Sequence, residues 1–528
     1  MMPENKDKYI LAIDLGTSGP KSALVSTKGE VIDYAFVKNS LQLLPDGGAE
    51  QDPEEWWQSI LETFKIILSK KLVPIEDIIA ISCSTQWSGT VAVDKNGEHL
   101  TNALIWLDSR GSEYVKEISD GLIKLEGYGI SKIQRWLRLT GGAPSHSGKD
   151  SIAHILYLKN QRPDIYHKTH KFLEPKDYIN LRLTGKFAAS YDSITLHWVT
   201  DNRDINNITY DDRLIRMSTI DKDKLPDLKQ ATDILGPLKQ EVAEELGLRP
   251  GVEVILGTPD VQAAAIGSGG VADYDAHFYI GTSSWLTCHV PFKKTDIFHG
   301  IASLPSAIPG RYFVANEQET AGACLTFLRD NIFFHKDDLL VGDCPANVYQ
   351  IFDQMAEKIA PGSGGIIFTP WLYGERTPLD DKYVRGGFFN QSLETTREHM
   401  VRAVLEGVAF NGRWLLEAVE KFVKRRLETV RMIGGGAASD IWCQIHADIF
   451  NREILQIKKP ILANVRGAAF LASVAMGHMR FEDVTDAVEV GKVYSPNSDH
   501  IGLYDRIFKE FKTIYKRNRR AYARLNKV

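Results

Sequence analysis

The tripeptide Gly-Thr-Ser occurs twice, at mirrored places in the chain. Gly16-Thr17-Ser18 lies near the start, and Gly281-Thr282-Ser283 follows 265 residues later, close to half the length of the 528-residue chain. An apolar, β-rich segment precedes each copy and another follows it, so each copy predicts two strands joined by a tight turn. This spacing predicts two halves of similar architecture, each with one such hairpin.

Composition and charge narrow the classes of protein that the chain can be. A hydrophobic fraction of 43% and a charged fraction of 25% are ordinary for a globular protein. With 63 basic and 68 acidic side chains the net charge is −5, which disfavours a nucleic-acid partner. The first apolar stretch is too short for a signal peptide, no run reaches the roughly 18 apolar residues of a membrane helix, and the five cysteines include no CxxC pair. We therefore expect a cytoplasmic protein without a membrane partner or a disulfide framework.

Helices and strands alternate along the chain. Asp52-Pro53-Glu54-Glu55 has the capping residues of a helix start, and apolar residues then recur at helical spacing. Thr395-Thr396-Arg397-Glu398 opens a second, long helix in the same way. The alternation predicts an α/β protein, and the glycine- and alanine-rich segment 251–275 is the expected boundary between domains.

The C-terminal segment is basic. Residues 504–528 carry nine Lys or Arg against two acids, with an apolar stripe at Ile507, Phe511 and Ile514. We expect an amphipathic helix docked on an acidic body, with a tail for a membrane surface or a nucleic acid as the alternative.

The first turn has residues that suit a phosphate. Asp14 ends a strand that should be buried, which is costly unless the acid caps a turn or faces a cation. The glycine-rich turn after it offers backbone N–H groups and two hydroxyls, and Asp14 would hold Mg²⁺ against a bound phosphate. Neither a Walker loop nor a dinucleotide-binding GxGxxG is present. One such turn alone is more often only a tight turn, but two mirrored copies favour a phosphate clasp.

Two further segments have a structural and a functional interpretation. Asp260 follows the apolar strand 252–256 and precedes a helical segment, so it either caps that helix or acts as a general base on an alcohol. Gly434-Gly435-Gly436-Ala437 is either a strand-to-helix turn or a surface for adenine and ribose. The motifs of metalloproteases, serine hydrolases and protein kinases are missing, so Asp, Thr, Ser and backbone amides favour phosphoryl transfer over acyl or hydride transfer.

Together these segments resemble the FGGY carbohydrate kinases, members of the actin-like and sugar-kinase ATPase superfamily. The resemblance covers nearly the whole chain, and the ordered set is far more specific than any one motif. The motifs, in chain order, are Asp14-Leu15-Gly16-Thr17-Ser18-Gly19 with Lys21, Glu50 to Trp57, Ile105 to Arg110, Pro175-Lys176-Asp177-Tyr178, Leu183-Thr184-Gly185, Gly257-Thr258-Pro259-Asp260, Ile280-Gly281-Thr282-Ser283, Gly374-Glu375-Arg376-Thr377-Pro378, Arg385-Gly386-Gly387-Phe388-Phe389 and Gly434 to Ala437.

The resemblance implies two ribonuclease-H-like domains with ATP and Mg²⁺ in the cleft between them. The expected division is an N-terminal kinase domain at 8–270, a C-terminal kinase domain at 271–485 and a basic helical extension at 486–528. Asp260 would be the base and Asp14 would lie near Mg²⁺. The nucleotide would be held by Gly16, Thr17, Ser18, Lys21, Gly281, Thr282, Gly322, Gly435, Gly436 and Ala437.

The resemblance defines the substrate that accepts the phosphoryl group less closely than it defines the nucleotide site. The chain is most similar to the xylulokinase and ribulokinase-type branch, which implies transfer to the terminal hydroxyl of a ketopentose such as D-xylulose, with D-ribulose or a related polyol as the alternative. The alternative hypothesis from another functional class is a non-catalytic sensor of sugar or ATP with the same fold. A homodimer is possible. Of the usual substrate strip only Gln86 is retained, and Val261 replaces a polar residue. The expected substrate contacts are Gln86, Trp87, Ser88, Asp108 and Asp260.

Overall fold

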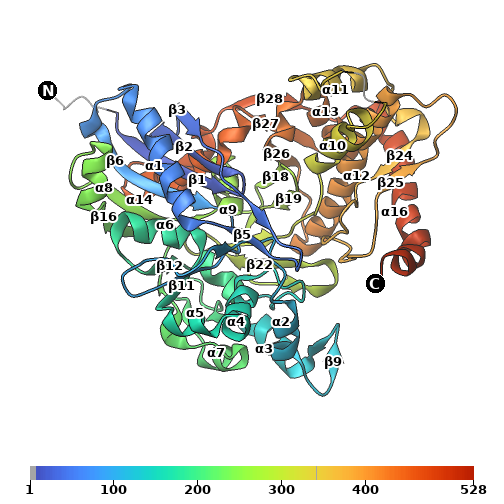
Figure 1. The fold of residues 1–528 in the computed structure, drawn as a ribbon. Coiled ribbons are helices and arrows are strands. Elements are labelled where there is room, and N and C mark those ends of the chain that lie inside the picture. Colours follow the sequence, from blue (N-terminus) through green and yellow to red (C-terminus); the bar gives the residue numbers. More distant parts are fainter. Residues whose placement is uncertain (1–6, 340–341, 528) are drawn as a thin grey trace.

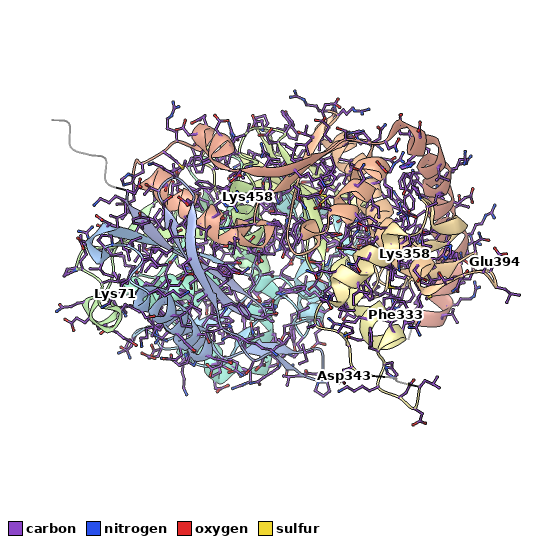
Figure 2. All side chains as sticks on the ribbon, turned by 90° about the horizontal axis from the view of Figure 1, so that it is seen from above. Lys71, Phe333, Asp343, Lys358, Glu394 and Lys458 are labelled. Carbon is purple, nitrogen blue, oxygen red and sulfur yellow. The ribbon has the colours of Figure 1, made fainter. Side chains whose placement is uncertain are left out.

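The computed structural model describes residues 7–339 and 342–527. Two α/β halves lie side by side, and a mostly helical lobe lies beneath the first half (Figure 1). Seen from above, Lys71 and Glu394 mark opposite ends of the molecule, and side chains fill the space between the ribbons of the two halves (Figure 2).

A six-stranded sheet forms the centre of the first half. The predicted strand–turn–strand is confirmed, because β1 and β2 pair antiparallel with Gly16 opposite Gly19 and Asp14 opposite Lys21. β6 runs parallel to β1, β17 runs parallel to β6, and β16 is antiparallel to β17. In sheet order the strands are β16 (Ile234–Pro237), β17 (Glu253–Pro259), β6 (Ile78–Thr85), β1 (Tyr9–Gly16), β2 (Gly19–Ser26) and β3 (Val31–Phe36).

A five-stranded sheet repeats this arrangement in the second half. β18 and β19 form an antiparallel hairpin, β26 and then β27 run parallel to β18, and β28 is antiparallel to β27. In sheet order the strands are β19 (Ser284–Thr287), β18 (Ala276–Ile280), β26 (Thr429–Ile433), β27 (Glu453–Ile457) and β28 (Val490–Tyr494). The prediction of two halves of similar architecture is therefore confirmed.

Two helices cross between the halves. α9 (Asp260–Gly267) begins where β17 ends but packs on apolar residues of the second sheet, whereas α14 (Ala463–Ala475) packs on the first sheet. At the crossing, a Cβ on Gly267 would lie 1.8 Å from the Ala463 carbonyl oxygen, and one on Gly467 would lie 1.9 Å from that of Ala263. Only glycine permits this approach on either helix, so the crossing is nearly symmetric.

The predicted helix starts are confirmed. α1 (Pro53–Ser69) begins with the Asp52 carboxylate accepting from the N–H of Glu54, and α12 (Arg397–Val423) begins after Thr396. The other helices of the second half are α10 (Gly322–Phe327), α11 (Val348–Glu357), α13 (Asp440–Phe450) and α15 (Phe481–Ala487).

The lobe joins the two halves on their lower side in Figure 1. Its apolar core includes Trp136 and Phe172 together with Leu304 and Phe313 from a small sheet of the second half. The lobe and the neighbouring edge of the first half contain α2 (Ser112–Ser119), α3 (Ile130–Leu139), α4 (Ser151–Gln161), α5 (Pro163–Lys168), α6 (Pro175–Thr184), α7 (Asp212–Ser218) and α8 (Gln240–Leu246). The small sheet has the order β20 (His289–Val290), β23 (Tyr312–Ala315), β22 (Ile301–Pro305) and β21 (Thr295–Asp296).

The basic C-terminal segment is a long helix, α16 (Ser498–Asn526), docked on the second half. Its buried face consists of Tyr504, Phe508, Phe511 and Tyr515. This confirms the prediction of a docked amphipathic helix, which packs against the apolar core of the second half. The division at 270/271 and 485/486 stays a prediction. None of the helices in the described part of the chain is both long and apolar enough to cross a membrane.

Candidate active site

Asp14 lies where the two halves meet. One carboxylate oxygen accepts a hydrogen bond from the Asn464 side chain at 3.2 Å, and Lys21 Nζ donates to the Ile461 carbonyl at 2.8 Å. Asn464 belongs to the first turn of α14, the helix that crosses onto the first sheet. The crossing therefore brings a residue 450 positions away against the first turn.

The Asp14 carboxyl suits a hydrated divalent cation. Burial raises its pKa, whereas Lys21 and the hydrogen bond from Asn464 lower it. The side chain is partly accessible, and its second oxygen has no hydrogen-bond partner among the described residues. A cation at this free oxygen would remove the cost of the buried charge, and Mg²⁺ prefers one or two carboxylates plus water and phosphate.

The Thr17 hydroxyl is already occupied in the first turn. It donates to Gln86 Oε1 and accepts from Trp106 Nε1, both at 2.9 Å. Gln86 is buried, and its amide nitrogen donates to Gln51 Oε1 at 2.8 Å. Thr17 and Gln86, which were predicted for the nucleotide and the substrate respectively, thus share one hydrogen-bond network, in which Gln86 holds the Thr17 hydroxyl. Ser18 is exposed and Gly16 is half-buried at the same turn.

Asp260 is the first residue of α9, whose N-cap is Pro259, and its carboxylate accepts a hydrogen bond from the Val261 N–H at 2.8 Å. Burial, and then the charge of Asp14, raise the pKa of Asp260 to about 8, while the Val261 hydrogen bond lowers it. Glu317 contributes a smaller increase. The cap interpretation of Asp260 is therefore wrong, because Pro259 is the N-cap, and the base interpretation stays a prediction that requires the ionised carboxylate.

The second turn faces the first from the other half. The Thr282 side chain is exposed and its hydroxyl has no partner within the described ranges, while its carbonyl accepts from the Ala321 N–H at 2.8 Å. The Gly322 N–H donates to the Gly281 carbonyl at 2.9 Å. A Cβ on Gly322 would lie 2.5 Å from that same oxygen, which explains a glycine there.

The third glycine segment ends β26. Gly435 is exposed, with open space where a Cβ would project, and Gly436 is half-buried. Ala437, by contrast, is fully buried in the apolar core of the second half. The open surface of this segment is therefore at Gly435 and Gly436, and the approach of Gly435, Gly436 and Ala437 to the nucleotide stays a prediction.

The substrate strip follows β6. Ser88 has a positive φ of 63° and its hydroxyl donates to the Lys149 carbonyl at 2.6 Å. Trp87 Nε1 donates to the Ser193 carbonyl at 3.0 Å, and its ring packs on Phe313 across the halves. Trp87 is half-buried, so part of its surface remains accessible.

Asp108 is not brought to this site. It is fully buried, and its oxygens accept from the Arg110 guanidinium, at 2.6 Å for Nη2, and from the Ala49 N–H at 3.0 Å. The expected substrate contact of Asp108 is therefore wrong for this structure: a carboxylate with a bidentate arginine two residues later has no free oxygen to offer.

The structure adds residues that the sequence did not indicate. Asn464 and Glu317 come from distant segments and carry no local motif for their roles, whereas Trp106 belongs to the motif Ile105 to Arg110 but was not singled out. Arg376 belongs to a recognised motif, and its guanidinium pairs with both Glu317 and Glu319. For Tyr279, a signal did exist, because it precedes its glycine by the same two residues as Asp14.

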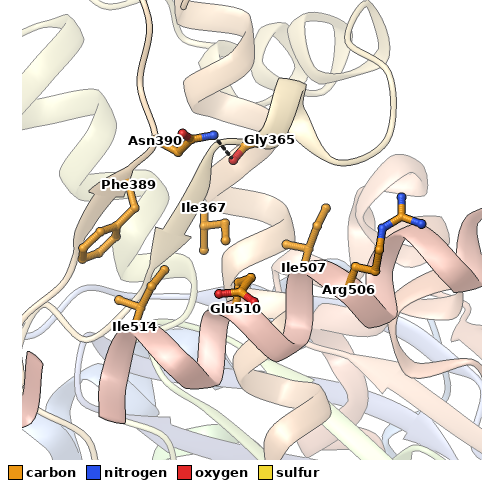
Figure 3. Close-up of a pocket in the computed structure, with 8 residues that line it drawn as sticks. All are labelled: Gly365, Ile367, Phe389, Asn390, Arg506, Ile507, Glu510 and Ile514. Atoms are coloured by element: carbon orange, nitrogen blue, oxygen red, sulfur yellow. Dashed lines mark hydrogen bonds between the residues drawn. The ribbon is translucent and has the colours of Figure 1, made fainter. Parts of the chain in front are cut away.

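A separate groove lies on the second half, between α16 and the strands β24 (Ile367–Thr369) and β25 (Gly387–Phe389) (Figure 3). Its volume is about 400 Å³, and Ile367, Ile507 and Ile514 line it together with Arg506 and Glu510. It includes none of the predicted site residues.

Two sheets of one topology, with two matching turns and two acids between them, define a phosphotransferase of the actin-like ATPase class. The N-terminal domain model of the FGGY family of carbohydrate kinases matches residues 9–267, and the C-terminal domain model matches 277–476. The chain belongs to this family and is a carbohydrate kinase. The phosphoryl donor of this family is ATP.

Similar proteins carry two different substrate names. The chain is 30% identical to the xylulose kinase of Lactococcus lactis, covering 96% of each chain, and 26% identical to the gluconokinase of Bacillus subtilis, covering 95% of this chain and 94% of the other. The solved xylulose kinase of Lactobacillus acidophilus matches with a TM-score of 0.85 at 25% identity, over 98% of this chain and all of that one.

Proposed function

We propose that the protein transfers the γ-phosphoryl group of ATP to the terminal hydroxyl of a ketopentose, with D-xylulose as the first acceptor to test and D-ribulose as the alternative. The observation that carries this proposal is the position of Asp260, a carboxyl at the start of the crossing helix α9 and within electrostatic range of Asp14. The similarity to xylulose kinases supports the choice of acceptor.

Asp260 takes the proton of the acceptor hydroxyl as the new oxygen–phosphorus bond forms. The bond between the γ-phosphorus and the bridging oxygen breaks, and ADP leaves with those electrons. Asp14 would hold Mg²⁺, which supplies charge neutralisation at the phosphates. The turns at Gly16 and Gly281 present backbone groups to the polyphosphate, and Gly435 leaves room for the adenosine.

The proposal is tested by measuring ADP release with Mg²⁺ and ATP over a panel of ketoses, aldoses, polyols and sugar acids. We expect Asp260→Asn to lower kcat by about 10²–10⁴-fold, as loss of a general base does. Asp275→Asn is the matched control, because burial raises the pKa of this carboxyl too, but it lies outside the site. Turnover that depends on sugar and survives in Asp260→Asn would contradict the role of the base.

A sugar acid is the second candidate acceptor, and Lys149 favours it. No hydrogen bond or ion pair is made by Lys149 Nζ in the described part of the chain, although Glu317, Glu319 and Arg376 lie close enough to shift its pKa. Burial is the main cause, and it lowers that pKa. Ser88 holds the Lys149 main chain, and the ammonium lies over the Tyr373 ring, 5.6 Å from its centroid, where it could pair with a carboxylate.

The two acceptors are separated by Lys149→Gln. If the acceptor is an acid such as D-gluconate, the variant should raise its KM by about 10-fold or more, since a hydrogen bond to a charged group is worth about 1.5–3 kcal/mol. The KM for D-xylulose should then be unchanged. Equal effects on both substrates, or none on the acid, would count against the sugar-acid alternative.

A further inference from the structure

Tyr279 occupies the position in the second half that Asp14 occupies in the first. Each lies on the first strand of its hairpin, two residues before the glycine of its Gly-Thr-Ser turn. Each pairs with a residue of the following hairpin strand, Asp14 with Lys21 and Tyr279 with Trp285. The repeat therefore brings a phenol to the place where the first half presents a carboxylate.

The Tyr279 ring is held at the second turn. It stacks on Trp285 with the ring centroids 4.0 Å apart and the planes 4° from parallel. A Cβ on Gly281 would lie 2.5 Å from Tyr279 Cε1 and 2.7 Å from the tyrosine hydroxyl. The hydroxyl thus lies directly against the glycine of the turn, and a larger residue at 281 would displace it.

The Tyr279 hydroxyl is a donor without an acceptor. No hydrogen bond to it is formed by any residue in 7–339 or 342–527, and the side chain is only half-buried. Burial raises the pKa of this phenol, and the charges of Asp14 and Asp260 raise it further. The hydroxyl therefore keeps its proton at neutral pH and lies within electrostatic range of both functional carboxylates.

We propose that Tyr279 is a further catalytic residue, whose hydroxyl donates a hydrogen bond to a non-bridging oxygen of the phosphoryl group in transfer. This inference rests on the proposed kinase function. Negative charge spreads over those oxygens in the transition state, and donors fixed beforehand stabilise it. The two carboxylates nearby would repel this charge, so a neutral donor at the second turn lowers that cost. The phenol keeps its proton and forms no covalent bond.

The test is Tyr279→Phe, which keeps the ring on Trp285 and removes only the hydroxyl. We expect kcat to fall by about 10²-fold, the usual effect of losing one such donor. The KM of the sugar and the unfolding temperature should not change. Tyr274→Phe is the control, because this tyrosine lies near the same strand and packs on Arg425 outside the site. An unchanged kcat, or a loss of kcat accompanied by a loss of stability, would overturn the proposal.

A second measurement does not depend on turnover. Calorimetry with Mg²⁺, ADP and aluminium fluoride, which mimics the phosphoryl group in transfer, should show weaker binding to Tyr279→Phe than to the parent protein. Binding of ADP alone should be equal in the two proteins. Equal affinity for the aluminium fluoride complex would overturn the role of Tyr279, whereas the absence of ADP release by the parent protein with every acceptor would overturn the proposed function instead.

Discussion

The two Gly-Thr-Ser turns share a sequence and a sheet position but differ in what surrounds them. The Thr17 hydroxyl is held between Gln86 and Trp106, and the strand before it presents a carboxylate, Asp14. The Thr282 hydroxyl has no partner in the part of the chain that is described, and the strand before it presents the phenol of Tyr279.

This difference indicates a division of labour between similar halves. The hydrogen bonds of the first turn lead to the acceptor strip, and its free carboxylate oxygen suits a cation. In the second turn the Thr282 hydroxyl has no partner among the described residues, which suits a turn that must receive a charged phosphate chain. A repeated fold can thus provide two phosphate turns and still specialise each through one strand position and its neighbours.

The largest expected effect of breaking this division is at Asp14. Asp14→Asn should lower kcat by about 10³-fold or more, because a divalent cation at the phosphates contributes several kcal/mol. The measurement is the Mg²⁺ dependence of ADP release, together with Mg²⁺ binding by calorimetry. Asp33→Asn, in the exposed pair with Lys70, is the control. An Asp14→Asn protein with the parent Mg²⁺ dependence would refute the cation role.

The crossing helices give a test of the symmetry itself. Gly267→Ala and Gly467→Ala should each lower the free energy of unfolding by about 1–3 kcal/mol, since each Cβ would overlap a carbonyl of the other helix. Urea titration measures both. Gly502→Ala in α16, where a Cβ meets nothing within 4 Å, should instead be neutral or stabilising. A large cost at one glycine and none at the other would show that the crossing is not symmetric.

Substitutions of Thr17 and Thr282 test the difference between the two turns directly. Thr17→Val should lower the free energy of unfolding by about 1–3 kcal/mol, because it leaves buried Gln86 without its donor, and it should raise the KM of the sugar. Thr282→Val should change stability by less than about 0.5 kcal/mol and raise the KM of ATP. Steady-state kinetics with each substrate varied in turn, plus urea unfolding, separates the two. Identical kinetic effects would argue against specialised turns.

The smallest expected effect is a shift in pH dependence. Asp260 must be ionised to accept a proton, so kcat/KM should rise with pH toward about 8. Removing the charge of Asp14 lowers the pKa of Asp260, so the residual activity of Asp14→Asn should reach its plateau at lower pH. A plateau at the parent pH would contradict the coupling.

The same raised pKa has a consequence for stability. Folding favours the neutral Asp260 carboxyl, so its contribution is present at low pH and is lost as the pH rises through about 8. The unfolding temperature of Asp260→Asn, relative to the parent protein, should therefore increase from about pH 6 to about pH 9.

Much of the candidate site could be predicted from local sequence. Asp14 and Asp260 end apolar strands, and the glycines at 16, 281 and 435 interrupt strands at matching places, so short-range patterns place each of them. Asp108 shows the limit of that reasoning. Its motif is the right one, but whether its carboxylate faces the cleft depends on Arg110 and on the main chain at Ala49, which folds against it from another segment.

The sequence by itself determined the α/β alternation, the repeated hairpin and the positions of the two acids, because periodicity, turn residues and strand ends depend on neighbours in the chain. The tertiary structure decided which partners surround each group. Asn464 reaches Asp14, and Tyr279 comes within electrostatic range of Asp14 and Asp260, because α9 and α14 cross between the halves, whereas Gln86 reaches Thr17 because β6 pairs with β1. The pKa of Asp260 was decided by the tertiary structure too, since its burial and the nearby charge of Asp14 arise only when β1, β6 and β17 form one sheet and α9 packs beside it.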